Sequence, residues 1–242
     1  MDIKALSDTV AKRRSHRKYY NDILSGEEQH AIEAAISELK PLYPDIKCKI
    51  ELVFKSHVRT MMPWMPPYAI VAFSEVRDGY LENIGFMLEE LDLFIQSCGL
   101  GLGSCWVGMG RPREGMLDAE GMEYVMMLAV GKTKEKMRKG EADFKRNSLS
   151  EISDTEDARL ASARLAPSSI NSQPWYFEHA EGAIRLYQKR LVRTKNLARM
   201  NRIDVGIALA HLYVSNPESF SYFIETPTPV LDKMDYILTF KI

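Results

Sequence analysis

The sequence has few cysteines and no excess of either charge. Its 242 residues include three cysteines, 32 basic and 33 acidic residues, for a net charge of −1. Three thiols (Cys48, Cys98 and Cys105) are an odd number in a chain long enough to bury its own core, so we expect reduced thiols and a cytoplasmic protein. A nucleic-acid partner is not expected, because phosphate contacts need a strongly basic face.

Long apolar runs and metal-binding patterns are also missing. No window approaches the roughly 20 apolar residues of a membrane helix, and the first twenty residues lack a signal-peptide core, so we expect neither membrane insertion nor secretion. The five histidines are scattered and no cysteine has a partner at ligand spacing, so we predict no metal site. No Ser-His-Asp or Cys-His set follows from the spacing, and we assign no catalytic side chain.

Helical and strand patterns recur in both halves of the chain. Apolar spacing predicts helices over 2–13, 26–40, 81–98, 154–166 and 203–214. Alternating or continuous apolar runs predict strands over 47–55, 68–73, 123–130 and 234–242, and two strands within 175–188. This mixture predicts an α+β fold.

A charged stretch separates the two halves. Residues 131–152 lack apolar periodicity and are typical of a surface connection. On each side the order is helix, strand, helix, strand, although the two sides share negligible identity. We therefore predict two similar halves, residues 1–135 and residues 136–242.

Three segments could carry chemistry. In Arg13-Arg14-Ser15-His16-Arg17, guanidiniums beside a hydroxyl suit a phosphate, although a solvated basic helix end has the same composition. Residues 99–108 contain four glycines, which let the backbone approach a flat ligand, or simply end a helix in a turn. Their spacing is neither a dinucleotide fingerprint nor a nucleophile elbow. Residues 166–175 place polar side chains between two prolines, as in a ligand-facing loop or a helix-to-strand connection.

Together these segments resemble the FMN-dependent nitroreductase family. The resemblance rests on RRSHR at 13–17, GLGSCWVG at 101–108 and APSSINSQPW at 166–175. In that family two α+β subunits hold FMN at their interface, the arginine motif coming from one subunit and the PSxxN loop from the other. Here the arginine motif stands in the first half and the loop in the second. The resemblance therefore implies a single-chain, duplicated pseudo-dimer with one complete FMN site.

The resemblance also implies roles for individual residues. The phosphate and ribityl chain are expected on Arg13, Arg14, Ser15 and Arg17, and near Arg146. The backbone of Cys105, Trp106, Val107 and Gly108 is expected to face the flavin edge, and Pro167, Ser168, Ser169 and Asn171 to close over the other side. The family's Asn-containing pyrimidine contact has no counterpart in residues 57–64.

The function implied is an FMN-dependent oxidoreductase. It would pass hydride from NAD(P)H through the flavin to a small acceptor such as a nitroaromatic or a quinone, as a monomer or a weak homodimer. The alternatives are a flavin-binding storage or sensor protein without turnover, and an interaction module in which the three motifs are only turns.

Overall fold

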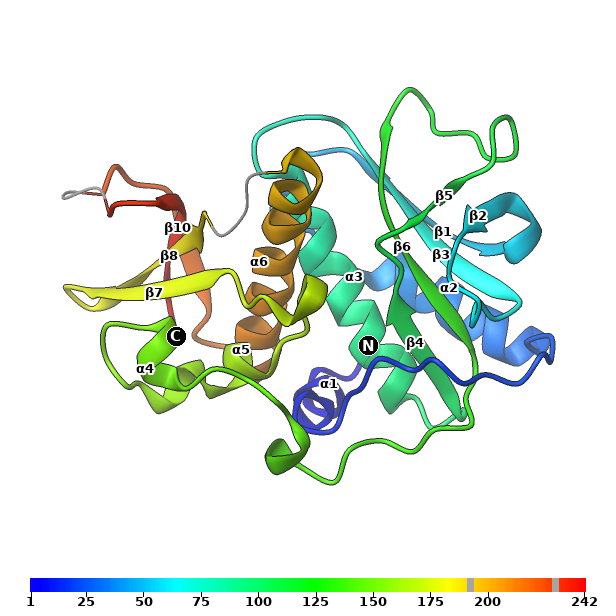
Figure 1. Cartoon of the computed structure of the whole chain (residues 1–242), viewed down its shortest axis with the longest axis horizontal. Helices are drawn as coiled ribbons and strands as arrows, with labels where there is room; N and C mark the ends of the chain where they lie inside the picture. The colour runs from blue at the N-terminus through cyan, green and yellow to red at the C-terminus, as the bar shows by residue number, and fades with distance from the viewer. Residues whose placement is uncertain (191–193, 228–230) are drawn as a thin grey trace.

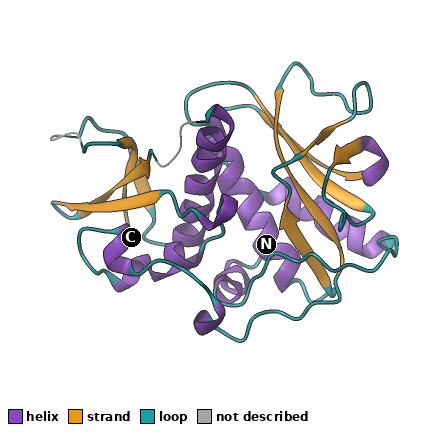
Figure 2. Ribbon diagram, in the orientation of Figure 1, coloured by secondary structure: helices purple, strands orange, loops and turns teal. Residues whose placement is uncertain are grey.

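Two antiparallel sheets stand on either side of a central pair of long helices in the computed structural model (Figure 1 and Figure 2). The structure describes residues 1–190, 194–227 and 231–242. Helices and strands are mixed in both halves, so the predicted α+β class is confirmed. None of the described helices is long and apolar enough to cross a lipid bilayer.

The first half contains one four-stranded sheet, in the order β1-β3-β6-β4. A two-stranded ribbon, β2-β5, lies beside it. In α2, Ser25 and Glu28 form a capping box that fixes the start of the helix. The elements are α1 (Ile3–Val10), α2 (Gly26–Glu38), β1 (Cys48–Phe54), β2 (Val58–Thr60), β3 (Tyr68–Ser74), α3 (Tyr80–Ser97), β4 (Leu102–Trp106), β5 (Gly110–Pro112) and β6 (Glu123–Lys132).

The second half contains another four-stranded sheet, in the order β7-β8-β10-β9. Its elements are α4 (Leu149–Ile152), α5 (Ala161–Leu165), β7 (Trp175–Ala180), β8 (Ala183–Lys189), α6 (Lys195–Ser215), β9 (Ser221–Phe223) and β10 (Met234–Lys241). Single 3₁₀ turns occur at Lys55–His57, Glu141–Asp143, Ala158–Leu160 and Ser169–Asn171.

The two sheets share one topology. In each, the first two strands along the chain are neighbours, the fourth strand pairs with the second, and the third forms the edge. In each half the long helix, α3 or α6, lies between the second and third strands.

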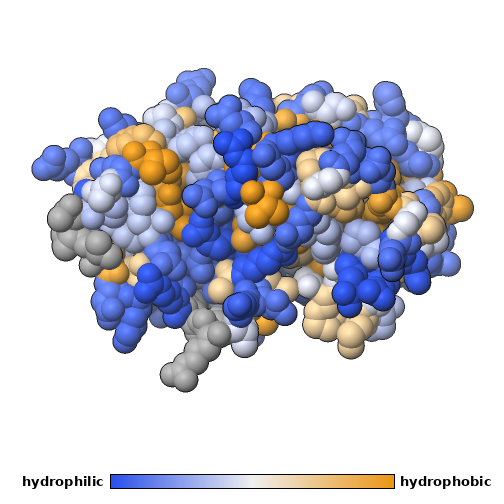
Figure 3. Space-filling view, turned by 90° about the horizontal axis from the view of Figure 1, so that it is seen from above, coloured by the Kyte–Doolittle hydropathy of each residue, from blue (hydrophilic) through white to orange (hydrophobic). Residues whose placement is uncertain are grey.

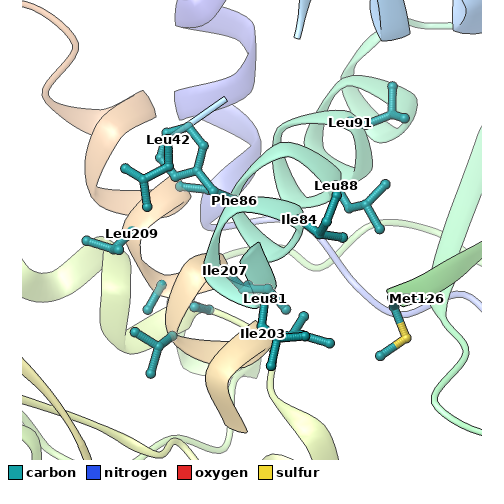
Figure 4. Packing of buried hydrophobic residues seen from close by; sticks show 14 of the residues in the cluster. Leu42, Leu81, Ile84, Phe86, Leu88, Leu91, Met126, Ile203, Ile207 and Leu209 are labelled. Atoms are coloured by element: carbon teal, nitrogen blue, oxygen red, sulfur yellow. The ribbon is translucent and has the colours of Figure 1, made fainter. Parts of the chain in front are cut away.

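The two long helices cross at a pair of glycines. A Cβ atom on Gly85 would overlap the carbonyl oxygen of Ile203, and one on Gly206 would overlap the carbonyl oxygen of Glu82. The contacts are reciprocal, because each glycine faces the residue that stands three positions before the other glycine. Apolar side chains of both helices pack around this crossing (Figure 4), among them Leu81, Ile84, Leu88, Ile203, Ile207 and Leu209. The crossing sets the relative position of everything attached to α3 and α6.

Several predicted elements differ from those observed. The helix expected over 154–166 is a 3₁₀ turn followed by the five residues of α5, which ends just before Pro167. The glycine-rich loop is a short turn, with Gly99 and Gly101 at positive φ, and then the edge strand β4. Helix α6 begins eight residues earlier than predicted, at Lys195, because its first turns lack the apolar spacing that the prediction required. The three cysteines are free thiols.

Candidate functional site

A cavity brings the three predicted segments together. Its walls come from the extended chain after α1, the end of β4, the loop before β7 and the first half of α6. It encloses about 200 Å³. The lining residues are Ser15, Arg17, Trp106, Gly108, Met126, Pro167, Ser168, Ser169, Ile170, Met200, Ile203, Asp204 and Ile207.

The predicted site residues divide into two groups. Seven line the cavity: Ser15, Arg17, Trp106, Gly108, Pro167, Ser168 and Ser169. Six are not among the lining residues: Arg13, Arg14, Cys105, Val107, Arg146 and Asn171.

Glu135 holds the segment that carries Ser15 and Arg17. Its carboxylate accepts hydrogen bonds from the backbone N–H groups of Arg17 and Lys18, at 2.6 and 3.0 Å, and pairs with the Arg14 guanidinium at 2.9 Å. These partners lower the pKa of Glu135 although partial burial opposes them. Arg14 therefore positions the segment, whereas the Arg17 side chain is exposed and forms no ion pair with a described carboxylate.

His16 anchors the same segment to β4. Its backbone N–H donates to the carbonyl oxygen of Ser104 at 2.9 Å, and its ring is buried against Gly103, where a Cβ atom would come within 2.6 Å of the ring. Burial lowers the pKa of His16 to about 4, so the ring is neutral at physiological pH. Gly103 is thus required for the close approach of this ring.

Arg13 belongs to a buried ionic network. Its Nε lies 2.8 Å from Asp92 Oδ2 and 3.5 Å from Glu89 Oε1, and its side chain is 1% exposed. The network takes the Arg13 side chain into the protein interior, away from the cavity lining. Arg13 is therefore not among the lining residues, and the contact between Arg13 and the cofactor phosphate stays a prediction. One of its nitrogens, Nη2, has no hydrogen-bond partner among the described residues.

Arg146 supports the proline-flanked loop from behind. It donates to the carbonyl oxygen of Ala166 at 3.1 Å and to the side-chain oxygen of Asn171. Burial and the nearby charges of Arg13 and Arg138 lower the pKa of Arg146 to about 10. Three arginines, Arg13, Arg138 and Arg146, are thus close enough to influence one another beside this loop.

The loop itself has unusual backbone conformations. Ile170, Asn171 and Gln173 have φ values of 50°, 59° and 48°, in the left-handed region that a β-branched residue rarely adopts. Ile170 is also 80% exposed, at the rim of the cavity. Such strain is concentrated at ligand-binding sites, where the surroundings hold it in place.

Asp204 is a charged lining residue that sequence reasoning missed. It lies on α6 between Ile203 and Ile207 and accepts a hydrogen bond from the backbone N–H of Ser169 at 3.0 Å. Burial raises the pKa of Asp204 to about 8. The available signal was a carboxylate within the apolar stripe of a predicted helix, since a buried Asp is rare without a partner. Met126, assigned to the core from sequence, is buried and also lines the cavity.

Asp204 gives a testable pH dependence. Its raised pKa means that folding stability falls as the pH rises from about 4 to about 8, because over this range the unfolded chain releases the proton that the native state retains. Asp204→Asn keeps the acceptor for Ser169 and removes this titration. Since each pKa unit corresponds to about 1.4 kcal/mol and the pKa rises from 3.8 to about 8, we expect the stability of the variant relative to the parent to increase by up to about 6 kcal/mol between pH 4 and pH 9. Urea denaturation at both pH values measures this, and an equal difference at the two would contradict it.

Asn83 stands two residues before Gly85 on α3, as Asp204 stands two residues before Gly206 on α6. Asn83 accepts a hydrogen bond from the backbone N–H of Tyr43 at 2.9 Å, as Asp204 does from Ser169. The ring of Tyr43 lies against Gly79, and its edge meets the ring of Tyr222 with centroids 5.8 Å apart. Aromatic side chains thus pack beside the hydrogen bond between Asn83 and Tyr43.

Comparisons with known proteins agree with this fold. A family model described as "Putative TM nitroreductase" matches residues 5–216. Among solved structures, a nitroreductase-like protein of Thermotoga maritima is 18% identical, with 99% of this chain and 92% of that chain covered and a TM-score of 0.65. A nitroreductase family protein of Clostridium difficile 630 is 18% identical over 62% of this chain and 96% of its own, with a TM-score of 0.47.

An FMN-dependent nitroreductase of Clostridium difficile R20291 is 19% identical over 59% of this chain and 94% of its own, with a TM-score of 0.43. No curated protein matches the chain. The Thermotoga maritima structure shows that the same fold extends over nearly the full length of both chains.

Proposed function

The chain belongs to the nitroreductase family and is an oxidoreductase, and from that premise we propose that it binds FMN in the cavity. With FMN bound, the protein would transfer hydride from NAD(P)H to a small acceptor such as a nitroaromatic or a quinone. One observation carries this proposal. The arginine segment of the first half and the proline-flanked loop of the second half line the same cavity.

The lining fits the parts of FMN. Trp106, Ile203 and Ile207 offer an apolar wall to a flat ring, and Ser168 and Asp204 add polar groups beside it. At the rim, the Arg17 guanidinium, which has no ion pair among the described residues, and the Ser15 hydroxyl suit a phosphate. The enclosed 200 Å³ is below the ~300–1,000 Å³ of ordinary ligand pockets, so the cofactor would extend past this rim.

Bound FMN would supply the hydride chemistry, and the protein supplies binding and orientation. The Arg146 and Asn171 side chains hold the loop in place behind the cavity wall. The carboxyl of Asp204, neutral below about pH 8, presents a proton at the wall while Ser169 fixes its orientation. Trp106 is fixed in turn, because its indole N–H donates to Glu89 at 3.0 Å.

We also propose that residues 1–135 and 136–242 are two fused halves of a pseudo-dimer. The shared sheet topology and the reciprocal glycine contacts support this division. Because the rings of Tyr43 and Tyr222 pack beside Asn83, the counterpart of Asp204, we expect only one cofactor site per chain. The interface between the halves is internal, so we expect a monomer in solution, or a weak homodimer.

The test combines flavin content with one substitution. We expect an FMN-to-chain ratio near one after reconstitution and gel filtration, and bleaching of the flavin by NADH or NADPH without oxygen. Arg17→Ala should weaken FMN binding about 10- to 100-fold, since charge-assisted hydrogen bonds are worth about 1.5–3 kcal/mol. Arg77→Ala, an exposed arginine on the loop before α3, is the control and should bind FMN normally.

Three results would change the proposal. A ratio near two contradicts the single site, and unchanged FMN binding in Arg17→Ala contradicts the phosphate assignment. A flavin that binds but is not bleached would identify a storage or sensor protein without turnover.

A further inference from the structure

A second, larger hollow adjoins the cofactor cavity. It encloses about 870 Å³ and shares three lining residues with that cavity: Gly108, Met126 and Met200. Its other walls come from the β2-β5 ribbon, β6 and the first turns of α6. In Figure 1 the start of α6 and this ribbon stand at the upper side of the molecule, and Figure 3 views that side as a largely hydrophilic surface with separate hydrophobic patches.

Two arginines face each other across the ribbon. Arg59 of β2 and Arg111 of β5 are directly paired in the antiparallel register, so their side chains leave the same face. Both are exposed, both line the hollow, and neither forms an ion pair with a described residue. Like charges in this arrangement are destabilising, and an anion held between the two guanidiniums would remove that repulsion.

The ribbon that carries them is fixed in place. The Thr60 hydroxyl donates a hydrogen bond to the carbonyl oxygen of Met109 at 3.2 Å. The Tyr124 hydroxyl donates one to the carbonyl oxygen of Gly110 at 2.9 Å. A third arginine, Arg199, also lines the hollow, but it is held by backbone carbonyls of β6 and by Glu123. No described lining residue is acidic. The hollow therefore favours negative charge.

Most of the remaining lining is apolar and rich in methionine. Met61 and Met109 are 78% and 53% exposed at the opening, and Met126 and Met200 form the border with the cofactor cavity. Methionine side chains adapt to ligands of different shape and make favourable contacts with aromatic rings. Such a surface beside a cationic pair fits a flat apolar molecule with one anionic group.

We propose that this hollow binds the second substrate and selects aromatic molecules that carry an anionic group, held by Arg59 and Arg111. The inference rests on the proposed function, because the substrate must reach the flavin past Gly108, Met126 and Met200. The anion could be the carboxylate of an aromatic acceptor or the extra phosphate of NADPH; the guanidinium pair recognises the shared chemistry.

The first experiment measures binding without turnover. Benzoate and benzyl alcohol are titrated calorimetrically into the FMN-loaded full chain. We expect benzoate to bind the parent more tightly than benzyl alcohol, and Arg59→Gln/Arg111→Gln to weaken benzoate at least 10-fold while changing benzyl alcohol less than threefold. The control, Lys4→Gln/Arg77→Gln, also removes two positive charges, but at exposed positions outside the lining of the hollow, and should behave as the parent.

The second experiment separates the two sources of the anion. A fall in kcat/KM for 4-nitrobenzoate but not 4-nitrobenzyl alcohol assigns the pair to the acceptor, and a fall for NADPH but not NADH assigns it to the nucleotide. Either result supports the proposal. Equal benzoate affinity in the parent and the double variant, or an equal loss in the charge-matched control, overturns it. FMN absorbance of each variant is recorded separately, because a chain that never binds FMN contradicts the proposed function instead.

Discussion

Arg13→Ala should destabilise the fold by about 3–5 kcal/mol, the cost of removing one partner from a buried ion pair. Arg13 sits between Asp92 and Glu89, whose side chains are fully buried. Without the guanidinium, two carboxylates on one helix would face each other in the interior. Burial and Asp92 already raise the pKa of Glu89 in the presence of Arg13. The loss of the arginine therefore leaves a repulsion that the remaining partners offset only in part.

The remaining partners connect this network to the cofactor site. His211 of α6 lies 2.8 Å from one oxygen of Glu89, and the indole of Trp106 donates to the other oxygen. Ser104 donates to Asp92 at 2.6 Å. A rearrangement of the two carboxylates would thus move β4 and Trp106, so the variant should also bind FMN poorly.

The pH and a second variant distinguish this explanation from a direct phosphate contact. Because the pKa of Glu89 is raised, its carboxyl takes up a proton on acidification, so the difference between Arg13→Ala and the parent should shrink as the pH falls. Arg17→Ala should instead lose FMN with no change in the stability of the cofactor-free chain. Urea denaturation of both variants at pH 4.5 and pH 7.5 measures this. A fully stable Arg13→Ala that merely releases FMN would contradict the structural role.

These two arginines also show what the sequence could predict. RRSHR is a candidate anion site from composition alone, but Arg13 and Arg17 look equivalent there. The difference between them depends on Asp92 and Glu89, which are distant in sequence and lie within an amphipathic helix that reads as core. A long-range ion pair has no local sequence signal, so the prediction of the segment could not extend to the role of each side chain.

In the fold, too, features with a local sequence signal are predicted and features that depend on distant partners are missed. Long elements with strong apolar patterns, such as β3, β6 and α3, are predicted within about two residues of their observed ends. The three-residue strands β2 and β5 are missed, because their pairing depends on partners about 50 residues apart. The proline-flanked loop is predicted as ligand-facing, whereas Asp204 and Ile207 enter the cavity only because α6 packs beside that loop.

Gly206→Ala should be at least as damaging as the loss of Arg13. In an ordinary helix this substitution stabilises by about 1 kcal/mol, because alanine has the higher helix propensity. At the crossing, however, the new methyl group would overlap the carbonyl oxygen of Glu82, a backbone atom in the middle of a packed helix. Neither helix can move without separating the apolar side chains around the crossing. We expect a net loss of about 3 kcal/mol or more, at the upper end of overpacking effects.

A matched glycine isolates the clash. Gly26→Ala, at the start of α2, adds the same methyl group where no atom lies within 4 Å, and should be neutral or slightly stabilising. Thermal unfolding of both variants in the absence of FMN provides the comparison. Gly85→Ala, which faces Ile203 across the same crossing, should reproduce the loss. If Gly206→Ala unfolds at the same temperature as Gly26→Ala, the two helices do not need their close contact, and the cavity between the halves cannot depend on it.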